Sequence, residues 1–542
     1  MYAATHSQGF LKFPAVRFPR TIRKMGDTDN SCRPARQSRS APILPKKTWL
    51  FAFISFICFE VHGKQGQRWP VKPLNELLAD HQKAGALAGF EVAFGCPHKS
   101  KCEWVGNFKD ENEMEQTVTQ LTTDQVLEIV RKKSRTIIDI RPVEAYNGWK
   151  SGNEERGGHI PGARSMPLKW FQYIDWPEII AAKDITADQH ICIYGYDAAE
   201  CAEAAGRFSK AGFKNVDVYE KFVEEWSANA SLPIERLERY RHLVSAQWLQ
   251  SLLKTGSAPE HTNEKFVVCH AHYRNPDAYN EGHIPGAIEI DTNTLESPKT
   301  WNRRTPEELK QTLEQNGITC DTTVILYGRF SFPDNNDSFP GSSAGHLGAI
   351  RCAAIMLYAG VKDVRVLNGG LQSWMDAGYD ISTERTEKQP VQDFGAAIPQ
   401  RSELFVDTPE AKEIIAAGDK NLVSVRSWPE WIGEVSGYNY IEKKGRIPGA
   451  VFGNCGSDAY HMENYRNVDH TIREHGEVEK IWEKIGVTAD KHNAFYCGTG
   501  WRGSEAFFNA WLLGWPRVSV YDGGWFEWSS DSANPYETGT PR

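Results

Sequence analysis

The hexapeptide GHIPGA occupies Gly158–Ala163, and the same six letters return at Gly282–Ala287. A third copy, GRIPGA, occupies Gly445–Ala450. Self-similarity of this kind indicates one structural unit written several times along a chain. The copies lie too far apart for the short repeats of a solenoid, so the spacing favours three separate domains.

Each copy has the same surroundings. An apolar run with an arginine precedes it, and an aromatic residue follows that arginine by five positions; the pairs are Arg141/Tyr146, Arg274/Tyr279 and Arg426/Trp431. A second apolar run, a helical stretch that ends at glycine and a third apolar run come after each copy. The second runs are ICIYG from Ile191, VILYG from Val324 and AFYCG from Ala494. Short apolar runs that alternate with helical patterns predict βα units and a parallel sheet.

We therefore expect an α/β protein with domains at about 68–240, 241–388 and 395–542, with Thr386–Gln400 as a polar linker. The chain has 542 residues, of which 40% are apolar and 24% charged, which is typical of globular proteins. Its formal net charge of −8 gives no indication of nucleic-acid binding.

Residues 1–67 read differently. The basic, Ser- and Pro-containing start is typical of an unfolded segment, and the apolar run TWLFAFISFICF at Thr48–Phe59 follows it. This run is shorter than the ~20 residues that a membrane span needs, so it favours an export signal. We expect an exported protein, periplasmic or secreted, without stable membrane association after cleavage; an uncleaved anchor or an organellar transit segment is the alternative.

The cysteines Cys96 and Cys102 could close a small disulfide outside the cytoplasm. A metal site there with His98 would be short of ligands, so neither a metal nor another cofactor is expected.

The stretch FYCGTGWRGSE, Phe495–Glu505, sets the third copy apart. When the copies are aligned by their final tryptophans, Cys497 falls opposite Gly195 and Gly328. A thiol at this place in one copy alone predicts one domain with chemistry and two that act as scaffolds or binding surfaces.

The same stretch predicts a buried strand, a tight turn and a helix over Gly503–Gly514. Gly498 and Gly500 permit a turn whose amides point inward as an anion cradle. A cysteine at a helix N-terminus beside the guanidinium of Arg502 is favoured as a thiolate, so Cys497 is the candidate nucleophile.

Other conspicuous residues are predicted to be structural. Because the motif arginines recur in the copies without a thiol, they favour a fold-stabilising ion pair or hydrogen bond over catalysis. The remaining cysteines of the three domains lack the turn's setting and are predicted to lie in the core; they are Cys192, Cys201, Cys269, Cys320, Cys352 and Cys455.

These residues together resemble the rhodanese family, in particular its three-domain exported bacterial sulfurtransferases with one active C-terminal domain. The resemblance implies three rhodanese-like domains, each a parallel five-stranded sheet with helices on both faces. It also implies that Cys497 takes up a sulfane sulfur as a persulfide and passes it on. The donor would be a small molecule such as thiosulfate or mercaptopyruvate, and the acceptor cyanide, a thiol or a protein. The persulfide would lie among the backbone amides of the loop, with Trp501 at its apolar rim and Arg502 toward the donor; the loop residues are Gly498, Thr499, Gly500, Trp501 and Arg502.

Two departures from the family pattern bear on this prediction. Glu430 stands where thiosulfate-preferring members often carry an arginine, which argues against a dianionic donor. Ser424 replaces the aspartate that the first copy keeps as Asp139, a change expected to affect structure more than chemistry.

Two other functions stay open. A phosphatase or arsenate reductase needs its arginine six residues after the cysteine, whereas Arg502 comes five after Cys497. A sulfur carrier or docking module would use the two thiol-less domains, and the lengthened Phe330–Ser343 loop in the second of them favours that role.

Overall fold

The computed structural model describes residues 118–330 and 345–541. Residues 1–67, the pair Cys96 and Cys102, and nearly all of the Phe330–Ser343 loop therefore lie outside the described residues, so the predictions made for them stay predictions. None of the helices in the described ranges has the length and apolar character needed to cross a membrane.

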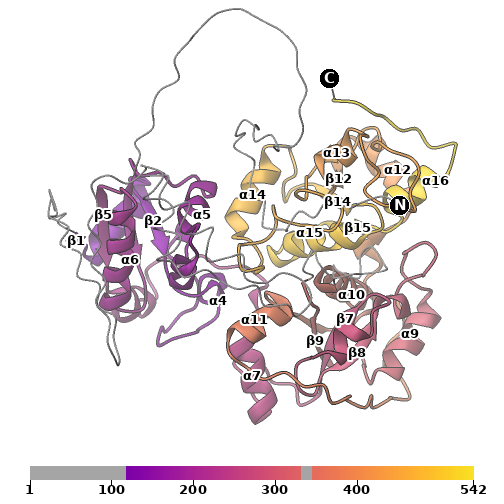
Figure 1. The fold of residues 1–542 in the computed structure, drawn as a ribbon, viewed down its shortest axis with the longest axis horizontal. Coiled ribbons are helices and arrows are strands. Elements are labelled where there is room, and N and C mark those ends of the chain that lie inside the picture. Colours follow the sequence, from indigo (N-terminus) through magenta and orange to yellow (C-terminus); the bar gives the residue numbers. More distant parts are fainter. Residues whose placement is uncertain (1–117, 331–344, 542) are drawn as a thin grey trace, which may run out of the picture. The chain divides into compact units, whose positions relative to one another are not determined.

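The described chain contains three five-stranded sheets, which follow one another from indigo through magenta to yellow in Figure 1. All strand pairs are parallel. The first sheet has the order β1-β5-β4-β2-β3, and the others repeat it as β6-β10-β9-β7-β8 and β11-β15-β14-β12-β13. The strands are β1 (Thr119–Gln120), β2 (Thr136–Asp139), β3 (Arg164–Ser165), β4 (His190–Tyr194), β5 (Asn215–Tyr219), β6 (Leu243–Val244), β7 (Phe266–His272), β8 (Ile288–Asp291), β9 (Thr323–Tyr327), β10 (Asp363–Leu367), β11 (Phe405–Val406), β12 (Lys420–Ser424), β13 (Val451–Phe452), β14 (His492–Tyr496) and β15 (Val518–Tyr521).

Helices connect these strands in every domain. The first domain has α3 (Thr123–Lys132), α4 (Val143–Asn147), α5 (Trp176–Ala182) and α6 (Ala198–Lys210). The second has α7 (Ala246–Thr255), α8 (Asp277–Asn280), α9 (Pro306–Gln315), α10 (Gly345–Ala359) and α11 (Gly370–Asp376). The third has α12 (Thr408–Ala417), α13 (Trp428–Trp431), α14 (His475–Glu483), α15 (Trp501–Leu512) and α16 (Gly524–Ser530).

Both faces of each sheet are covered, as expected for buried parallel strands. In β4, Ile191 and Ile193 belong to one apolar cluster, which includes residues of α5 and α6. Cys192 and Tyr194, between and after them, belong to a second cluster with residues of α3. Successive side chains of a strand point to opposite faces, so helices pack on both. The predicted fold class is confirmed.

The repeated hexapeptide has a structural reason. Its final alanine accepts a hydrogen bond from the tyrosine that follows the motif arginine: Tyr146 Oη donates to the Ala163 carbonyl at 2.9 Å, and Tyr279 Oη to Ala287 at 2.9 Å. The histidine of GHIPGA stacks on the same tyrosine ring, with centroids 3.7 Å apart in both domains. The arginine–aromatic pair and the hexapeptide are thus two halves of one contact.

The motif arginines are structural in two domains. Arg141 is fully buried against Asp139 and donates to the Gly158 carbonyl at 2.6 Å. Arg426 is buried likewise and donates to the Gly445 carbonyl at 2.6 Å.

The second domain differs from this expectation. Arg274 has a positive φ of 53° and donates to the Pro298 carbonyl instead. The matching carbonyl, that of Gly282, accepts from Arg329 at 2.7 Å. Arg329 follows Gly328, the glycine that lies opposite Cys497, so this domain builds the same contact from a residue of the equivalent loop.

The second and third domains share one continuous apolar cluster. Helix α10 is buried along its whole length, and its sequence GHLGAIRCAAIMLYA has no polar stripe, as expected for a helix packed on all sides. It packs against α15, which is also buried along its length.

Candidate active site

The loop Cys497–Gly500 connects β14 to α15. Because β14 lies in the middle of its parallel sheet, the loop stands at the carboxyl edge of the central strands, where open α/β sheets bind ligands. The predicted strand–turn–helix order is confirmed, although α15 begins at Trp501, two residues earlier than expected. The earlier start brings Trp501 and Arg502 into the first helical turn.

Two backbone hydrogen bonds from helix α16 hold the loop in place. The amides of Trp525 and Phe526 donate to the carbonyls of Cys497 and Gly498 at 2.8 and 2.9 Å. Among the described residues, the amides of Gly498, Thr499 and Gly500 donate to no other protein group. The loop thus turns its carbonyls toward α16 and keeps free N–H groups at a helix N-terminus, the arrangement that holds an anionic sulfur.

The two loop glycines have different reasons. A Cβ on Gly498 would lie 2.0 Å from the ring of Tyr438, so that ring packs directly on the backbone next to Cys497. Gly500 has φ of +96°, and a Cβ there would meet Arg351 of the second domain at 3.1 Å. Only glycine permits both the turn and these close approaches.

Arg502 does not extend freely into the site. Its two terminal nitrogens donate to the two carboxylate oxygens of Glu430, each at 2.9 Å, in a bidentate pair whose partners are 1% exposed. It also donates to the Cys455 sulfur at 3.0 Å and to the Tyr438 hydroxyl at 3.0 Å. The expectation that Arg502 faces the donor stays a prediction, and Glu430 already neutralises its charge.

Burial raises the pKa of Glu430, but Arg502 and Arg426 outweigh that effect and lower it to about 2. Glu430 is therefore ionised at neutral pH. Its effect on a donor is indirect: it cancels an arginine charge that would otherwise attract the anion.

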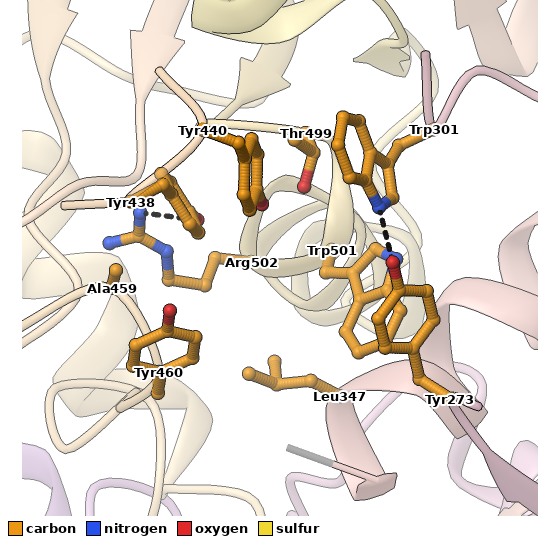
Figure 2. Close-up of a pocket in the computed structure, with 10 residues that line it drawn as sticks. All are labelled: Tyr273, Trp301, Leu347, Tyr438, Tyr440, Ala459, Tyr460, Thr499, Trp501 and Arg502. Atoms are coloured by element: carbon orange, nitrogen blue, oxygen red, sulfur yellow. Dashed lines mark hydrogen bonds between the residues drawn. The ribbon is translucent and has the colours of Figure 1, made fainter. Parts of the chain in front are cut away.

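A pocket with about 370 Å³ of empty space, including the part open to solvent, lies beside the loop. Figure 2 shows the aromatic rings that surround it. Six of its ten lining residues are tyrosine or tryptophan; the ten are Tyr273, Trp301, Leu347, Tyr438, Tyr440, Ala459, Tyr460, Thr499, Trp501 and Arg502. Concave sites with mostly aromatic walls and a few polar groups are typical of small-molecule binding.

The second domain supplies three of these lining residues, Tyr273, Trp301 and Leu347. Trp301 stacks on Tyr440 with ring centroids 4.4 Å apart, and its indole N–H donates to the Tyr273 hydroxyl at 3.3 Å. The pocket is therefore complete only with residues of two domains.

Of the predicted loop residues, Thr499, Trp501 and Arg502 line the pocket. Cys497 is fully buried, and the backbone of the next residue, Gly498, packs against the Tyr438 ring, which lines the pocket. Burial raises the pKa of the Tyr438 and Tyr440 phenols, so both are neutral at physiological pH. The thiol thus lies next to the pocket and out of contact with bulk water.

The predicted core cysteines are all buried. Burial raises the pKa of four of their thiols to about 12, which makes them unreactive; these are Cys192, Cys201, Cys269 and Cys455. The contact of Cys455 with the site was not predicted: its sulfur accepts a hydrogen bond from Arg502.

Sequence reasoning missed most of the pocket. Tyr438 and Tyr440 lie in the segment GYNYIE. Two aromatic residues that do not belong to the apolar pattern of a helix or strand were the available sign that this segment lines a site. Trp301 and Tyr273 carried no signal, since they belong to a domain without the thiol. Groups of side chains able to hold a metal ion do not occur in the two described ranges.

A family model for the rhodanese-like domain matches three times, at residues 122–229, 245–377 and 407–531. The chain therefore belongs to the rhodanese family and is a sulfurtransferase of that family. Each match falls within one of the predicted domains, whose exact boundaries stay predictions.

Particular relatives are more specific. The chain is 38% identical over 423 residues to the thiosulfate sulfurtransferase YnjE of Escherichia coli, an alignment that covers 77% of this chain and 92% of that protein. It is 31% identical to the sulfur carrier protein TtuD of Thermus thermophilus, over 53% of this chain and 93% of that protein.

Solved structures of EanB are also similar. A tyrosine-to-alanine variant of EanB in complex with ergothioneine has 59% sequence identity and a TM-score of 0.77, covering 79% of this chain and all of that chain. A second EanB structure, a variant with a cysteine persulfide in a tetrahedral intermediate state with ergothioneine, has 60% identity and a TM-score of 0.76 over 78% of this chain. A third, a double cysteine variant, holds hercynine and has 58% identity over 80% of this chain, with a TM-score of 0.77.

Proposed function

We propose that this protein transfers sulfane sulfur, through a persulfide on Cys497, to the imidazole ring of hercynine and so forms ergothioneine. Hercynine is the trimethylated betaine of histidine, and ergothioneine carries one additional sulfur on the imidazole carbon between the two nitrogens. The likeness to EanB, at 58–60% identity over its whole length, suggests this pair of compounds.

The aromatic pocket beside Cys497 is the observation that carries the proposal. A quaternary ammonium group binds best against the faces of tryptophan and tyrosine rings, because the ring quadrupole attracts a cation that cannot form hydrogen bonds. Six such rings surround this pocket. Cyanide, the acceptor commonly used to assay such enzymes, would need none of them.

The reaction has two half-reactions. In the first, the thiolate of Cys497 attacks a sulfane sulfur, and the donor leaves with its electron pair. In the second, a carbon–sulfur bond forms on the imidazole, the S–S bond breaks, and the carbon loses a proton to a base. Cys497 recovers the electron pair of the S–S bond; the carbon is oxidised and the sulfane sulfur reduced, so no outside oxidant is needed.

The chain's own groups divide this work. The free loop amides hold the persulfide, and α16 keeps the loop in position. Tyr438 packs on the loop and accepts a hydrogen bond from Arg502, which leaves its own proton available to the acceptor or to the sulfur. Solved EanB structures include variants of a tyrosine and a threonine, and Tyr438 and Thr499 are residues of those types in this pocket.

The donor follows from the charge of the site. Arg502 is paired with Glu430 through both terminal nitrogens. Among the described residues that line the pocket, no guanidinium is therefore left without a carboxylate partner to bind a dianion. We therefore propose a donor of lower charge than thiosulfate, such as mercaptopyruvate or a small persulfide. The same pairing argues against a phosphatase or arsenate reductase, which would need that arginine to hold an oxyanion.

A protein acceptor is the second candidate, favoured by the similarity to the sulfur carrier TtuD. A buried Cys497 beside an aromatic pocket favours a small acceptor, because a protein thiol would have to reach past Tyr438 and Tyr440. Export of the protein stays a prediction from the N-terminal sequence.

The test follows one sulfur atom. Wild-type protein is loaded with a sulfane donor, its intact mass is measured, and hercynine is added with chromatographic detection of ergothioneine. We expect a mass gain of one sulfur at Cys497, its loss on adding hercynine, and an equal amount of ergothioneine.

Cys497→Ser should neither gain the mass of one sulfur nor form ergothioneine. Cys455→Ser should do both, since a serine can replace the thiol beside Arg502. A protein that loads sulfur and passes it to cyanide but never to hercynine would contradict the proposed acceptor and leave the sulfurtransferase class intact.

A further inference from the structure

Glu296, a residue of the second domain, whose equivalent loop has no cysteine, contacts the catalytic loop directly. Its two carboxylate oxygens accept hydrogen bonds from the indole N–H of Trp501 at 2.8 and 3.1 Å. One of them also accepts from Arg351 Nε at 3.1 Å. Glu296 and Arg351 are both fully buried, so this contact lies out of water between the domains.

Arg351 extends the contact to the rest of the loop. Its Nη2 donates to Asp522 at 2.5 Å, at the end of β15, and its Nη1 lies 3.5 Å from the hydroxyl of Ser504 in α15. The space above Gly500 is filled by the same guanidinium. The second domain therefore contacts the third at Gly500, at the end of the loop, at Trp501, the first residue of α15, and at Ser504, about one turn further along that helix.

The same guanidinium also holds Trp301. Arg351 Nη2 donates to the Trp301 carbonyl at 2.9 Å. Trp301 has a φ of 60°, a left-handed conformation that a bulky side chain adopts only where its surroundings impose it. Both tryptophans that line the pocket are thus held by one buried network, Trp501 through Glu296 and Trp301 through Arg351.

We propose that Glu296 and Arg351 are positioning residues for the acceptor half-reaction: they fix the indoles of Trp501 and Trp301 as walls of the acceptor pocket and take no part in loading Cys497 with sulfur. This inference rests on the proposed function for the identity of the acceptor. It gives the second domain, which has no thiol in its loop, the task of selecting what receives the sulfur.

A purely structural role would predict something else. Buried ion pairs contribute little net stability compared with apolar residues of the same shape, and their best-attested use is to fix one arrangement among several. If the network only joined the domains, its loss would affect both half-reactions alike. If it positions the walls, its removal slows transfer to a large acceptor that binds against the aromatic rings and leaves transfer to a small acceptor such as cyanide unchanged.

The main variant is Glu296→Gln, in which an amide oxygen can still accept one hydrogen bond. Burial raises the pKa of Glu296 to about 7, so the comparison is made at pH 8, where the wild-type carboxylate is mostly ionised and the variant removes its charge. Trp501→Phe is the second variant, since it removes the indole N–H and leaves the Glu296–Arg351 pair in place. The matched control is Glu474→Gln, at a buried carboxylate that pairs with Arg164 and Lys183 of the first domain and does not line the pocket.

Three rates are measured on the full-length protein: persulfide formation on Cys497, transfer to cyanide and transfer to hercynine. For Glu296→Gln we expect KM for hercynine to rise about tenfold, while loading and cyanide transfer stay within about twofold of wild type. Trp501→Phe should also raise KM for hercynine, and KM in the double variant should be no higher than in the poorer single one, because both changes break one interaction. Glu474→Gln should leave all three rates unchanged.

Equal losses in loading and in both transfers, or an unchanged KM for hercynine in Glu296→Gln, would overturn the inference. Fluorine NMR of protein labelled with 5-fluorotryptophan gives a readout that needs no acceptor. The Trp501 signal, identified by its absence in Trp501→Phe, should shift or broaden in Glu296→Gln and not in Glu474→Gln.

An unchanged Trp501 signal would also overturn the inference. A wild-type protein that transfers sulfur to cyanide but not to hercynine would instead refute the proposed acceptor, and the NMR comparison would still decide whether Glu296 positions Trp501.

Discussion

Glu430 shows how one carboxylate changes the character of a cysteine site. It binds both terminal nitrogens of Arg502 and also contacts Arg426, so three buried charges form one unit. A guanidinium whose nitrogens already bind a carboxylate attracts an incoming anion less than a free one. Because one carboxylate is shared by two arginines, the unit keeps one net positive charge, which is less than two free guanidinium groups would present to an incoming anion.

The stability of the protein should depend on pH through Glu430. Its pKa is lowered from 4.5 to about 2 in the fold, so the folded state favours the ionised form. The resulting stabilisation, on the order of 3 kcal/mol, is present above pH 4.5 and is lost as the pH falls toward 2. Urea unfolding between pH 7 and 3 measures it.

In Glu430→Gln we expect a loss of at least this size at pH 7, and a difference from wild type that shrinks below pH 4.5. Glu434→Gln, at an exposed position nearby, should change the free energy of unfolding by less than ~0.5 kcal/mol. A constant difference across the range would show that Glu430 is not the group that titrates.

The ring of Tyr440 tests cation binding in the pocket. It stacks on Trp301 and lies near the thiol, so its aromatic face is part of the wall. If the wall binds a quaternary ammonium through ring faces, Tyr440→Phe keeps the interaction and Tyr440→Leu removes it. We expect KM for hercynine to rise about tenfold in the leucine variant and to change little in the phenylalanine variant. Equal effects of the two substitutions would assign the loss to the hydroxyl instead.

At the scale of the element, the β14–loop–α15 unit depends on a glycine in its loop and on hydrogen bonds from α16 that hold the loop in place. Gly498 must admit the Tyr438 ring, while two amides of α16 hold the loop carbonyls. A loop held from one side and packed on the other keeps its amides in place before the substrate arrives, which is how preorganised sites stabilise developing charge.

Gly498→Ala should therefore disturb the site even though the residue added is small. Its Cβ would lie 2.0 Å from the Tyr438 ring, so the ring or the loop must move. We expect persulfide formation to fall at least about tenfold and the free energy of unfolding to drop by about 1–3 kcal/mol.

Gly206→Ala is the matched control, because this glycine lies within α6 and an added Cβ has nothing within 4 Å. It should stabilise the protein by about 0.5–1 kcal/mol. If Gly498→Ala behaved like Gly206→Ala, Tyr438 would not be packed on the loop.

The elements themselves could largely be predicted from the sequence. The repeated hexapeptide, the apolar runs and the helical stretches depend on local periodicity and on contacts within one domain, such as Tyr146 with Ala163. Arg274 is an instructive failure: its place in the motif matched Arg141, yet Arg329 occupies the equivalent contact. Two arginines within reach of one carbonyl cannot be told apart from spacing alone.

At the scale of the whole molecule, the limit of prediction is the distance along the chain. The loop around Cys497 was visible as a motif, whereas seven of the ten residues that line its pocket were not predicted. Glu296 and Trp501 are 205 positions apart and belong to different domains, and nothing in the periodicity of either segment refers to the other. Packing of α10 against α15 brings them together, and the mostly apolar sequence of α10, which has no polar stripe, was the one sign that this helix would be covered.

Breaking the buried network between these domains should strongly destabilise their contact. Arg351 has partners in both domains, Glu296 and Asp522, and all three side chains are fully buried. Removing one partner of a buried ion pair strands the others in a medium that solvates them poorly, at a cost of about 3–5 kcal/mol. Arg351→Ala should lower the free energy of unfolding by this amount, measured by urea denaturation.

Lys362→Ala is the comparison, because Lys362 pairs with Asp321 on the surface, with side chains 71% and 67% exposed. An exposed pair contributes at most about 1 kcal/mol, so this variant should unfold close to wild type. If the two variants unfolded alike, the network would contribute nothing beyond shape, and the two domains would be held together by the apolar contact of α10 with α15 alone. A large difference would mean that the buried network adds to the apolar contact in holding the second and third domains together around the pocket they share.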